Sequence, residues 1–369
     1  MFEAGDGTAA NPYQITNVYQ FKNISKRMKK DESLKNFVSN NVLVNENEVF
    51  NFQVMNDIEL CYNETDGTVA GEFNGILFGG EFDGIICGKN LSTDADPIYP
   101  LISYKSTGVS KLQNSITVKD GNVLSSSTAV STTFETGAAL FESFSSNSKI
   151  SNLRLSAKFQ KEDALVDKSA QIVDYTKAIP QDSLISGLVI SNAGTVENVV
   201  LESFVNSFYG FIGSNTKIMM VYSGLVSINS GANANITNCQ NKSNMNVSDL
   251  SRAQTIFVGG ICYTNYATIS GCVGGTSENT ISIDCQASNE AIQAAGIAIT
   301  NTTSGKIENC RNNYDITVSA ASVDVTAFIG GIVDLGAGNL SNNKNNGNLS
   351  ANNIQTLYKG DIAATTKRP

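Results

Sequence analysis

The chain has no histidine and no tryptophan among its 369 residues. Without histidine, catalytic triads and dyads that use an imidazole base are excluded, and the commonest zinc ligand is missing. No apolar run approaches the ~18 residues that cross a membrane. The opening MFEAGDGT also lacks the charged and apolar regions of a signal peptide. We therefore expect no membrane insertion by this segment and no histidine-based active site.

Charged residues are scarce as well, at 16% of the chain, and the formal net charge is −9. Binding to nucleic acid requires a basic surface, and the only basic cluster lies in residues 22–30. Nucleic acid is therefore excluded as a partner. Asn, Ser, Thr and Gly dominate the composition, which suits an extracellular surface.

The C-terminal half contains a degenerate repeat of about 36 residues. Each repeat has a glycine between a small and an apolar residue, at Gly187, Gly224, Gly260, Gly296 and Gly331. Each also has an apolar residue followed two positions later by Asn or Gly, at Val196, Ile236, Ile269, Ile307 and Leu340. A fixed period in this range indicates a solenoid, a propeller or an array.

Short β-branched runs such as TISI and DITV, bounded by Gly, Asn or Ser, predict strands between turns rather than helices. A WD40 propeller is excluded because its Gly-His and Trp-Asp signatures are missing. The repeat length fits one turn of a parallel β-helix with three short strands. Ile236, Ile269, Ile307 and Leu340 should then stack as one interior ladder, with corner asparagines in the left-handed conformation.

The N-terminal half resembles a known family in four segments. GDGTAANPYQITNVYQFKNI (5–24) resembles the opening of bacterial surface proteins with GLUG-type right-handed β-helices. MNDIEL (55–60), FGGEFDGIICG (78–88) and AALFESFSSNSKISNLRL (138–155) resemble the steps that follow in that family. The resemblance covers most of residues 5–350. It implies a right-handed parallel β-helix solenoid, secretion and display on the bacterial surface, but no particular reaction.

We therefore expect three regions. Residues 1–50 form an N-terminal cap with a short helix, 51–355 form the β-helix, and 356–369 form a flexible tail or a truncated end. No clear cap follows Leu340, so the chain is expected to belong to a longer protein with other domains.

The capping helix is expected to begin after Asn17, with Gln20 as the partner in a capping box. Its apolar face comprises Val18, Phe21, Ile24 and Met28. We interpret it as a lid on the first turn of the β-helix, because an uncovered sheet edge promotes aggregation. The alternative is a membrane or partner helix that uses the basic residues of 22–30.

Two inserts, at about 103–137 and 157–183, interrupt the repeat. The first contains KDG between SITV and NVLS, which predicts a hairpin turn. Loops on a rigid scaffold often carry binding residues, although long insertions are also tolerated without a function. The aromatic group in FVNSFYGFIG, Phe204, Phe208, Tyr209 and Phe211, is expected to be core with one or two exposed rings rather than a sugar-stacking patch.

The seven cysteines show no metal-binding spacing. Cys239, Cys272 and Cys310 share one repeat position. A disulfide or metal ladder is possible there, but side chains of stacked parallel strands point the same way. We therefore expect buried, reduced thiols that act as small hydrophobic groups.

The densest acidic group is Asp57, Glu59, Glu72, Glu81 and Asp83. A glycosidase needs two carboxylates ~5–9.5 Å apart, but Asp57 and Asp83 lie in turn segments where a carboxylate bonds the backbone. Asp94 and Asp96 are expected in a loop. NETDG (63–67) and DAD (94–96) are the candidate calcium segments, although calcium-loop motifs are missing.

These observations favour a secreted or cell-surface protein that acts as an adhesin, stalk or binding scaffold for a glycan or protein ligand. No catalytic, cofactor-binding or metal-binding residue is assigned, and no cofactor is expected. The alternative is a carbohydrate-active enzyme, a polysaccharide lyase or glycosidase, or a glycan-binding module on a β-helix.

Overall fold

The computed structural model describes residues 2, 4–24, 49–60, 73–120, 130–159, 182–206, 218–249, 254–285, 291–320 and 324–365. Within these ranges the protein is all-β, with three sheets and one short helix, α1 (Val18–Lys22). Neighbouring strands in the described ranges are parallel except for one pair, β7 with β8. The expected all-β fold with parallel sheets is therefore confirmed.

The first sheet has fifteen strands and follows the order β1-β2-β5-β9-β12-β15-β20-β25-β30, with the others beside this path. Its strands are β1 (Tyr13–Ile15), β2 (Phe50–Val54), β3 (Ile58–Glu59), β5 (Gly84–Gly88), β6 (Leu101–Ser106), β9 (Lys149–Phe159), β12 (Thr195–Asn206), β15 (Asn235–Thr237), β16 (Gln240–Asn241), β20 (Thr268–Ser270), β21 (Val273–Gly274), β25 (Lys306–Glu308), β26 (Arg311–Asn312), β30 (Asn339–Ser341) and β31 (Lys344–Asn345).

The second sheet also has fifteen strands, in the order β33-β28-β23-β18-β13-β10-β8-β11-β14-β19-β24-β29-β34, with β4 and β7 attached to β8. Its strands are β4 (Ile76–Phe82), β7 (Ser110–Asp120), β8 (Val130–Phe144), β10 (Ser183–Ser186), β11 (Val189–Asn192), β13 (Ile218–Ser223), β14 (Val226–Asn229), β18 (Gln254–Gly259), β19 (Cys262–Asn265), β23 (Ala291–Ala295), β24 (Ala298–Asn301), β28 (Thr326–Gly330), β29 (Val333–Gly336), β33 (Thr356–Gly360) and β34 (Ala363–Thr365). The third sheet contains β17 (Met245–Asp249), β22 (Thr280–Cys285), β27 (Asp315–Ala320) and β32 (Leu349–Asn352).

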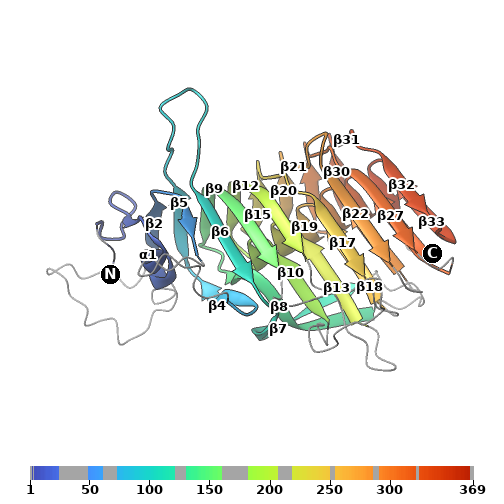
Figure 1. Cartoon of the computed structure of the whole chain (residues 1–369), viewed down its shortest axis with the longest axis horizontal. Coiled ribbons are helices and arrows are strands. Elements are labelled where there is room, and N and C mark those ends of the chain that lie inside the picture. Colours follow the sequence, from blue (N-terminus) through green and yellow to red (C-terminus); the bar gives the residue numbers. More distant parts are fainter. Residues whose placement is uncertain are drawn as a thin grey trace, which may run out of the picture.

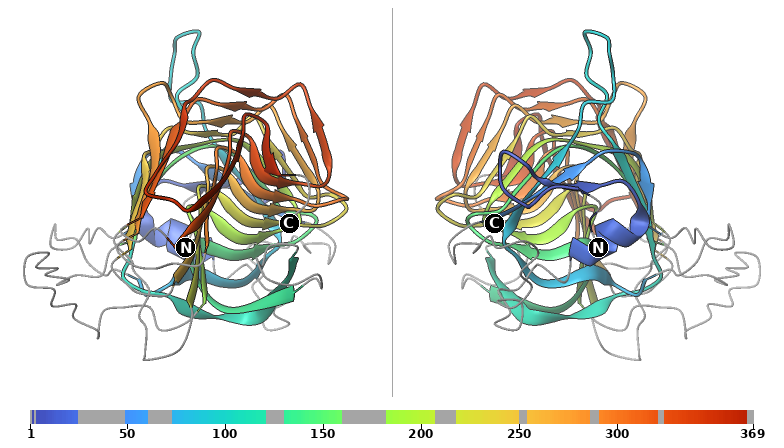
Figure 2. Two further views of the ribbon diagram at one scale, coloured as in Figure 1. Left: turned by 90° about the vertical axis from the view of Figure 1, so that its right-hand side faces the viewer. Right: turned by 90° about the vertical axis from the view of Figure 1, so that its left-hand side faces the viewer.

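From β13 onward the chain visits the three sheets in turn, and each visit adds strands beside those of the previous one. In residues 254–285, β18 and β19 join the second sheet, β20 and β21 the first, and β22 the third. We call such a passage a repeat. Successive repeats lie side by side from the blue N-terminal end to the red C-terminal end (Figure 1). Figure 2 shows the same stack from its two ends.

The predicted interior ladder is confirmed. Ile236 pairs with Ile269, Ile269 with Ile307, and Ile307 with Leu340. The three isoleucines are fully buried and Leu340 is half-buried. The same ladder continues toward the N-terminus through Val196, Ile150, Ile86, Phe52 and Tyr13. One unbroken column of core residues therefore links β1 to β30.

The repeated glycines occupy a bend between consecutive strands of the second sheet, such as β13 and β14. A Cβ built on Gly224 would lie 2.0 Å from the carbonyl oxygen of Gly260 in the next repeat. The corresponding distance from Gly187 to the oxygen of Gly224 is 2.2 Å. Glycine is required at this bend because the backbone of the next repeat fills the space of a side chain.

The repeated asparagines form corners in the first sheet, within the long strand β12 and directly after the short strands β15, β25 and β30. Asn198, Asn238, Asn309 and Asn342 have φ values of 52°, 53°, 55° and 54°, and Gly271 takes the same place with φ 62°. Asparagine is among the few residues that adopt this left-handed conformation readily. The predicted conformation of the corners is therefore confirmed.

The helix α1 begins where the sequence predicts. The Asn17 side chain accepts a hydrogen bond from the Gln20 amide at 3.0 Å, and Val18, Phe21 and Ile24 are buried. The Gln20 side chain differs from a capping box, because its oxygen accepts from the Thr16 amide at 2.7 Å instead of the Asn17 amide. The predicted Met28 and basic residues 26–30 lie outside the described residues.

The first insert does not match the loop expected for residues 103–137. β6 lies within the first sheet, and β7 pairs antiparallel with β8 as far as Asp120 with Val130. The predicted turn at KDG (119–121) is therefore wrong, because Lys119 and Asp120 still pair with β8 as part of β7. Leu112, Val118 and Phe134 are buried against the outer surface of the second sheet. A hydrophobic hairpin that covers other strands is part of the scaffold and not a free loop.

The second insert and the C-terminus are described only in part. Of the insert expected at 157–183, residues 157–159 end β9 and 182–183 lead into β10, while 160–181 lie outside the described residues. Of the aromatic group, Phe204 is buried and the others lie outside this range. The tail expected from residue 356 is ordered as β33 and β34, which pair with β28 and β29. Strand pairing thus continues to Thr365, ten residues beyond residue 355, where the β-helix was expected to end.

Candidate functional site

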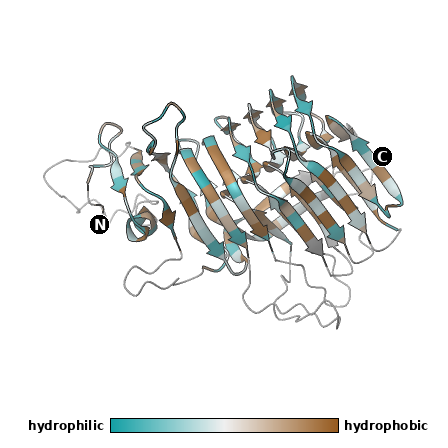
Figure 3. Ribbon diagram, turned by 45° about the horizontal axis from the view of Figure 1, so that its top comes forward, coloured by the Kyte–Doolittle hydropathy of each residue, from teal (hydrophilic) through white to brown (hydrophobic). Residues whose placement is uncertain are grey.

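The outer side of the first sheet presents two columns of polar side chains, which we call the lateral face. Residues of this sheet alternate between the core and the outside, as the hydropathy colours show (Figure 3). The lateral face comprises the paired columns Lys149, Thr195, Asn235, Thr268, Lys306 and Asn339, and Ser151, Glu197, Thr237, Ser270, Glu308 and Ser341. It combines hydroxyl, amide and charged groups at the spacing of adjacent strands.

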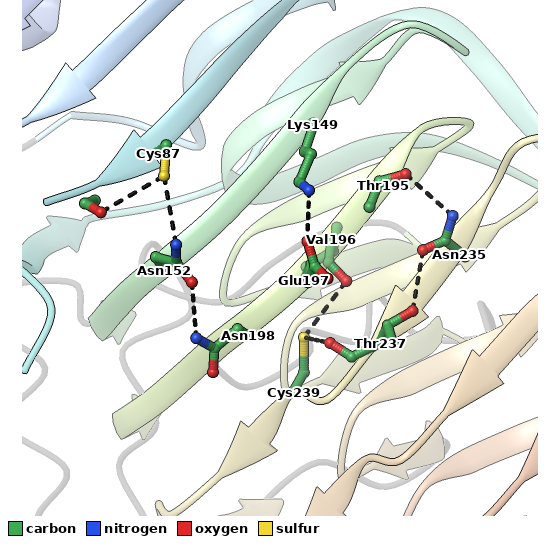
Figure 4. Close-up of polar contacts among 11 residues, drawn as sticks. Cys87, Lys149, Asn152, Thr195, Val196, Glu197, Asn198, Asn235, Thr237 and Cys239 are labelled. Carbon is green, nitrogen blue, oxygen red and sulfur yellow. Dashed lines mark hydrogen bonds and ion pairs between the residues drawn. The ribbon is translucent and has the colours of Figure 1, made fainter. Parts of the chain in front are cut away.

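Its charged residues pair with one another. Lys149 Nζ lies 2.5 Å from Glu197 Oε2 on the next strand (Figure 4), and Lys306 Nζ lies 2.8 Å from Glu308 Oε2. The Lys149 and Glu197 side chains are 41% and 38% exposed. Exposed pairs of this kind contribute about 0–1 kcal/mol. They balance the charge of the face and add little to its stability.

Its neutral residues are held by hydrogen bonds between and within repeats (Figure 4). Asn235 Nδ2 donates to Thr195 Oγ1 at 3.0 Å, and Thr237 Oγ1 donates to Asn235 Oδ1 at 3.1 Å. At the neighbouring corner, Asn198 Nδ2 donates to Asn152 Oδ1 at 2.7 Å. These bonds fix the directions of donors and acceptors that remain half-buried at the surface. Such a face is suited to bind a ligand rich in hydroxyl groups.

Loop 89–100, between β5 and β6, stands away from the stack (Figure 1, upper left). It carries two exposed apolar side chains, Leu91 at 40% and Ile98 at 51%. The Leu91 amide donates to the Ile98 carbonyl at 2.7 Å, and the Ile98 amide donates to Asn90 Oδ1 at 3.1 Å. The two apolar residues therefore lie side by side on a loop whose shape is set by its own hydrogen bonds.

The base of this loop is anchored by Arg154 of β9. Arg154 Nε donates to the Tyr99 carbonyl at 2.7 Å, and the Arg154 amide donates to the Pro100 carbonyl at 2.8 Å. Asp57 Oδ1 accepts from the Leu101 amide at 2.8 Å and lies 3.5 Å from Arg154 Nη2. The loop therefore emerges from a fixed base.

Of the acidic residues considered for catalysis, Asp57 and Asp83 make structural hydrogen bonds. Asp57 bonds the backbone of Leu101, as expected for a turn carboxylate. Asp83 accepts from the Ser145 hydroxyl. Glu59 and Glu81 are exposed, and Asp94 and Asp96 lie in loop 89–100 as expected. Glu72 and the segment NETDG (63–67) lie outside the described residues.

The stacked cysteines are buried, as predicted: Cys239, Cys272 and Cys310 are 0–1% exposed. Each thiol lies near a carbonyl of the preceding repeat, at 3.6 Å from Cys239 Sγ to Val196 O and 3.5 Å from Cys272 Sγ to Ile236 O. Burial, reinforced by the thiols above and below, raises the pKa of Cys272 well above its ordinary value. For Cys272 these properties are those of a protonated core thiol. Cys87, Cys239, Cys262, Cys272 and Cys310 form no disulfide, and Cys61 lies outside the described residues.

A buried asparagine ladder is the main feature that sequence reasoning missed. Asn192 Nδ2 donates to Asn229 Oδ1, Asn229 to Asn265, and Asn265 to Asn301, each at 2.8 Å. All four side chains are fully buried. Their recurrence at separations of 37, 36 and 36 residues is a signal that was present in the sequence.

A buried carboxylate was also missed. Glu142 of β8 accepts from the Gly80 amide at 2.6 Å and the Gln113 amide at 2.5 Å. It thereby joins β4 and β7 to β8. Glu142 does not recur at a repeat position, so periodicity could not reveal it. Its contacts depend on how the β7–β8 hairpin packs against β4.

Among the described residues, no group of three or more Cys, Asp or Glu side chains is placed to hold a metal ion. Over the same ranges, no helix has the length and hydrophobicity of a membrane span. Comparisons with family models, with curated proteins and with solved structures found no match to this chain.

Proposed function

We propose that this chain is a right-handed parallel β-helix that acts as a secreted or cell-surface bacterial binding scaffold, of the adhesin or stalk kind. Its largely parallel sheets, which a repeating unit visits in turn from β13 onward, support the solenoid architecture. The N-terminal segments that resemble GLUG-type surface proteins support the location. Its polar, weakly charged composition suits an extracellular surface.

The observation that carries the proposal is that the molecule combines a continuous core with a projecting loop. The ladder from Tyr13 to Leu340 gives a stiff axis. Loop 89–100 stands off that axis with Leu91 and Ile98 exposed and with a base fixed by Arg154. Scattered exposed apolar residues are ordinary, but a preformed loop that presents two of them together favours a contact surface.

A glycan-binding module is the second candidate, and the lateral face favours it. Asn235 and Thr237 belong to columns of amide and hydroxyl groups that repeat at strand spacing, ~4.8 Å. Those groups are oriented by bonds between and within repeats, so a polysaccharide would meet a preorganised surface. The enzyme alternative is less favoured because Asp57 and Asp83 are engaged in structural bonds.

Binding of the purified chain to immobilised glycans and to a mucin glycoprotein tests both candidates. We expect L91S/I98S to weaken binding about tenfold or more if the loop is the contact site, since ~1.4 kcal/mol corresponds to that factor. The matched control is V205S, which changes another exposed apolar residue of the first sheet. Loss of binding in N235A/T237A with L91S/I98S unaffected would assign the glycan-binding module instead. Cleavage of a polysaccharide by the wild-type chain would contradict both.

A further inference from the structure

The last described repeat ends in a set of open sheet edges, which we call the end face. Its strands β30, β32, β33 and β34 each lie at the end of a sheet path. Core positions are only half-buried there, at Leu340, Leu349, Ile354 and Ile362. An open parallel edge over an apolar interior is a template for pairing with another chain.

Lys359 occupies a core position in this face. Its strand pairing places it in the column Ile185, Tyr222, Val258, Ala294, Ile329 and Lys359. The first five members belong to the buried core. Lys359 Nζ lies 3.3 Å from the Leu349 carbonyl oxygen of the third sheet. Its ammonium group therefore extends toward the opposite sheet at the open end of the core.

Asp361 occupies the position of the bend glycine. The bend reads Gly259-Gly260-Ile261, Gly330-Gly331-Ile332 and then Gly360-Asp361-Ile362. A Cβ on Gly331 would lie 2.0 Å from the Asp361 carbonyl oxygen, just as earlier glycines meet the carbonyl of the repeat above them. The Cβ of Asp361 would obstruct the carbonyl of any chain stacked in the same way.

We propose that Lys359 and Asp361 together prevent a second copy of this chain from pairing with the end face. Stacking would bury the Lys359 ammonium among apolar side chains, which is costly for an unpaired charge. It would also force a backbone oxygen against the Asp361 side chain. Inward-pointing charges are a known means of protecting a sheet edge. The end face thus keeps its apolar interior without becoming an association site.

Sedimentation equilibrium of the full chain tests this proposal. The wild type should remain a monomer of 39.2 kDa. K359I/D361G restores an apolar ladder and a bend glycine, and we expect it to self-associate at least about tenfold more tightly, equivalent to ~1.4 kcal/mol. The single variants K359I and D361G should associate less than the double variant.

The matched control is K344I, which removes an outward-facing lysine of the preceding repeat and should stay monomeric. Circular dichroism verifies that each variant is folded. Hydrogen exchange should show new protection in β30 and β33 of the double variant. A wild type that dimerises, or a folded double variant that stays as monomeric as K344I, would overturn the proposal.

Discussion

The carbonyl oxygen of Gly260 lies 2.0 Å from the point where a Cβ on Gly224 would stand. The two residues occupy the same position in successive repeats, and the Gly224 amide donates to Gly259 at 3.0 Å. The repeats therefore pack backbone against backbone at this bend. This close approach explains why glycine recurs there until Asp361 replaces it.

Replacing Gly224 with alanine should destabilise the fold by about 3 kcal/mol, because overpacking against backbone cannot be relieved by a rotamer change. Urea unfolding followed by circular dichroism measures the effect. Gly79 is the matched control, because a Cβ there meets nothing nearer than 3.5 Å. Equal stability losses in G224A and G79A would contradict this packing.

Ile269 sits in the middle of the interior ladder and is fully buried. I269A should cost about 3 kcal/mol, since the cavity adds to the lost burial. I269D should prevent folding because its carboxylate would be buried without a partner. T268A changes the adjacent outward residue and should shift stability by less than about 0.5 kcal/mol. Chemical denaturation of the three variants decides whether the two neighbouring positions differ in this way.

Asn229 both accepts from Asn192 and donates to Asn265 inside the stack. N229A should cost about 2 kcal/mol, because it leaves buried amide groups without their partners. N233A, at an exposed corner, provides the comparison. If thermal unfolding gives the same midpoint for both variants, the asparagine ladder contributes no net stability.

The raised pKa of Cys272 predicts a dependence of stability on alkaline pH. An unfolded thiol loses its proton near its ordinary value of 9.0, while the folded Cys272 retains its proton to much higher pH. The folded state then binds more protons, so stability is complete below pH 9 and falls as the pH rises above it. C272A should therefore flatten the slope of unfolding free energy between pH 9 and 11 relative to the wild type. An unchanged slope would show that Cys272 is not held protonated.

The repeat positions made much of the C-terminal half predictable. Ile236, Ile269 and Ile307 could be placed in one ladder because identical positions in stacked repeats must meet. The asparagine corners followed from their tolerance of left-handed φ. Asn17 could be assigned as a helix cap because its side-chain chemistry is local.

The hairpin could not be predicted because its packing is not local. Phe134 is buried against residues far away in the chain, including Tyr263, with ring centroids 6.3 Å apart. The KDG signal suggested a short turn, but pairing from Ser110 to Asp120 extends strand β7 into that motif. Glu142 is likewise defined by two amides from different strands. Such features depend on tertiary contacts that no periodicity encodes.

Only part of the candidate site could be predicted from the sequence. The sequence placed Asp94 and Asp96 in a loop, but the exposure of Leu91 and Ile98 follows from the hydrogen bonds that fold loop 89–100 on itself. The Lys149–Glu197 pair is distant in the chain and becomes adjacent only through strand pairing. Those relationships emerge once the register of the repeats is known.

The stacked arrangement of repeats is the central claim, and a distance between spin labels at positions 149 and 339 tests it most directly. Both residues belong to one column of the lateral face, with Thr195, Asn235, Thr268 and Lys306 between them. Five strand steps of about 4.8 Å predict a narrow distribution centred near ~24 Å for K149C/N339C. A distribution centred beyond ~35 Å, or one too broad to define a centre, would contradict a continuous parallel stack with this strand spacing.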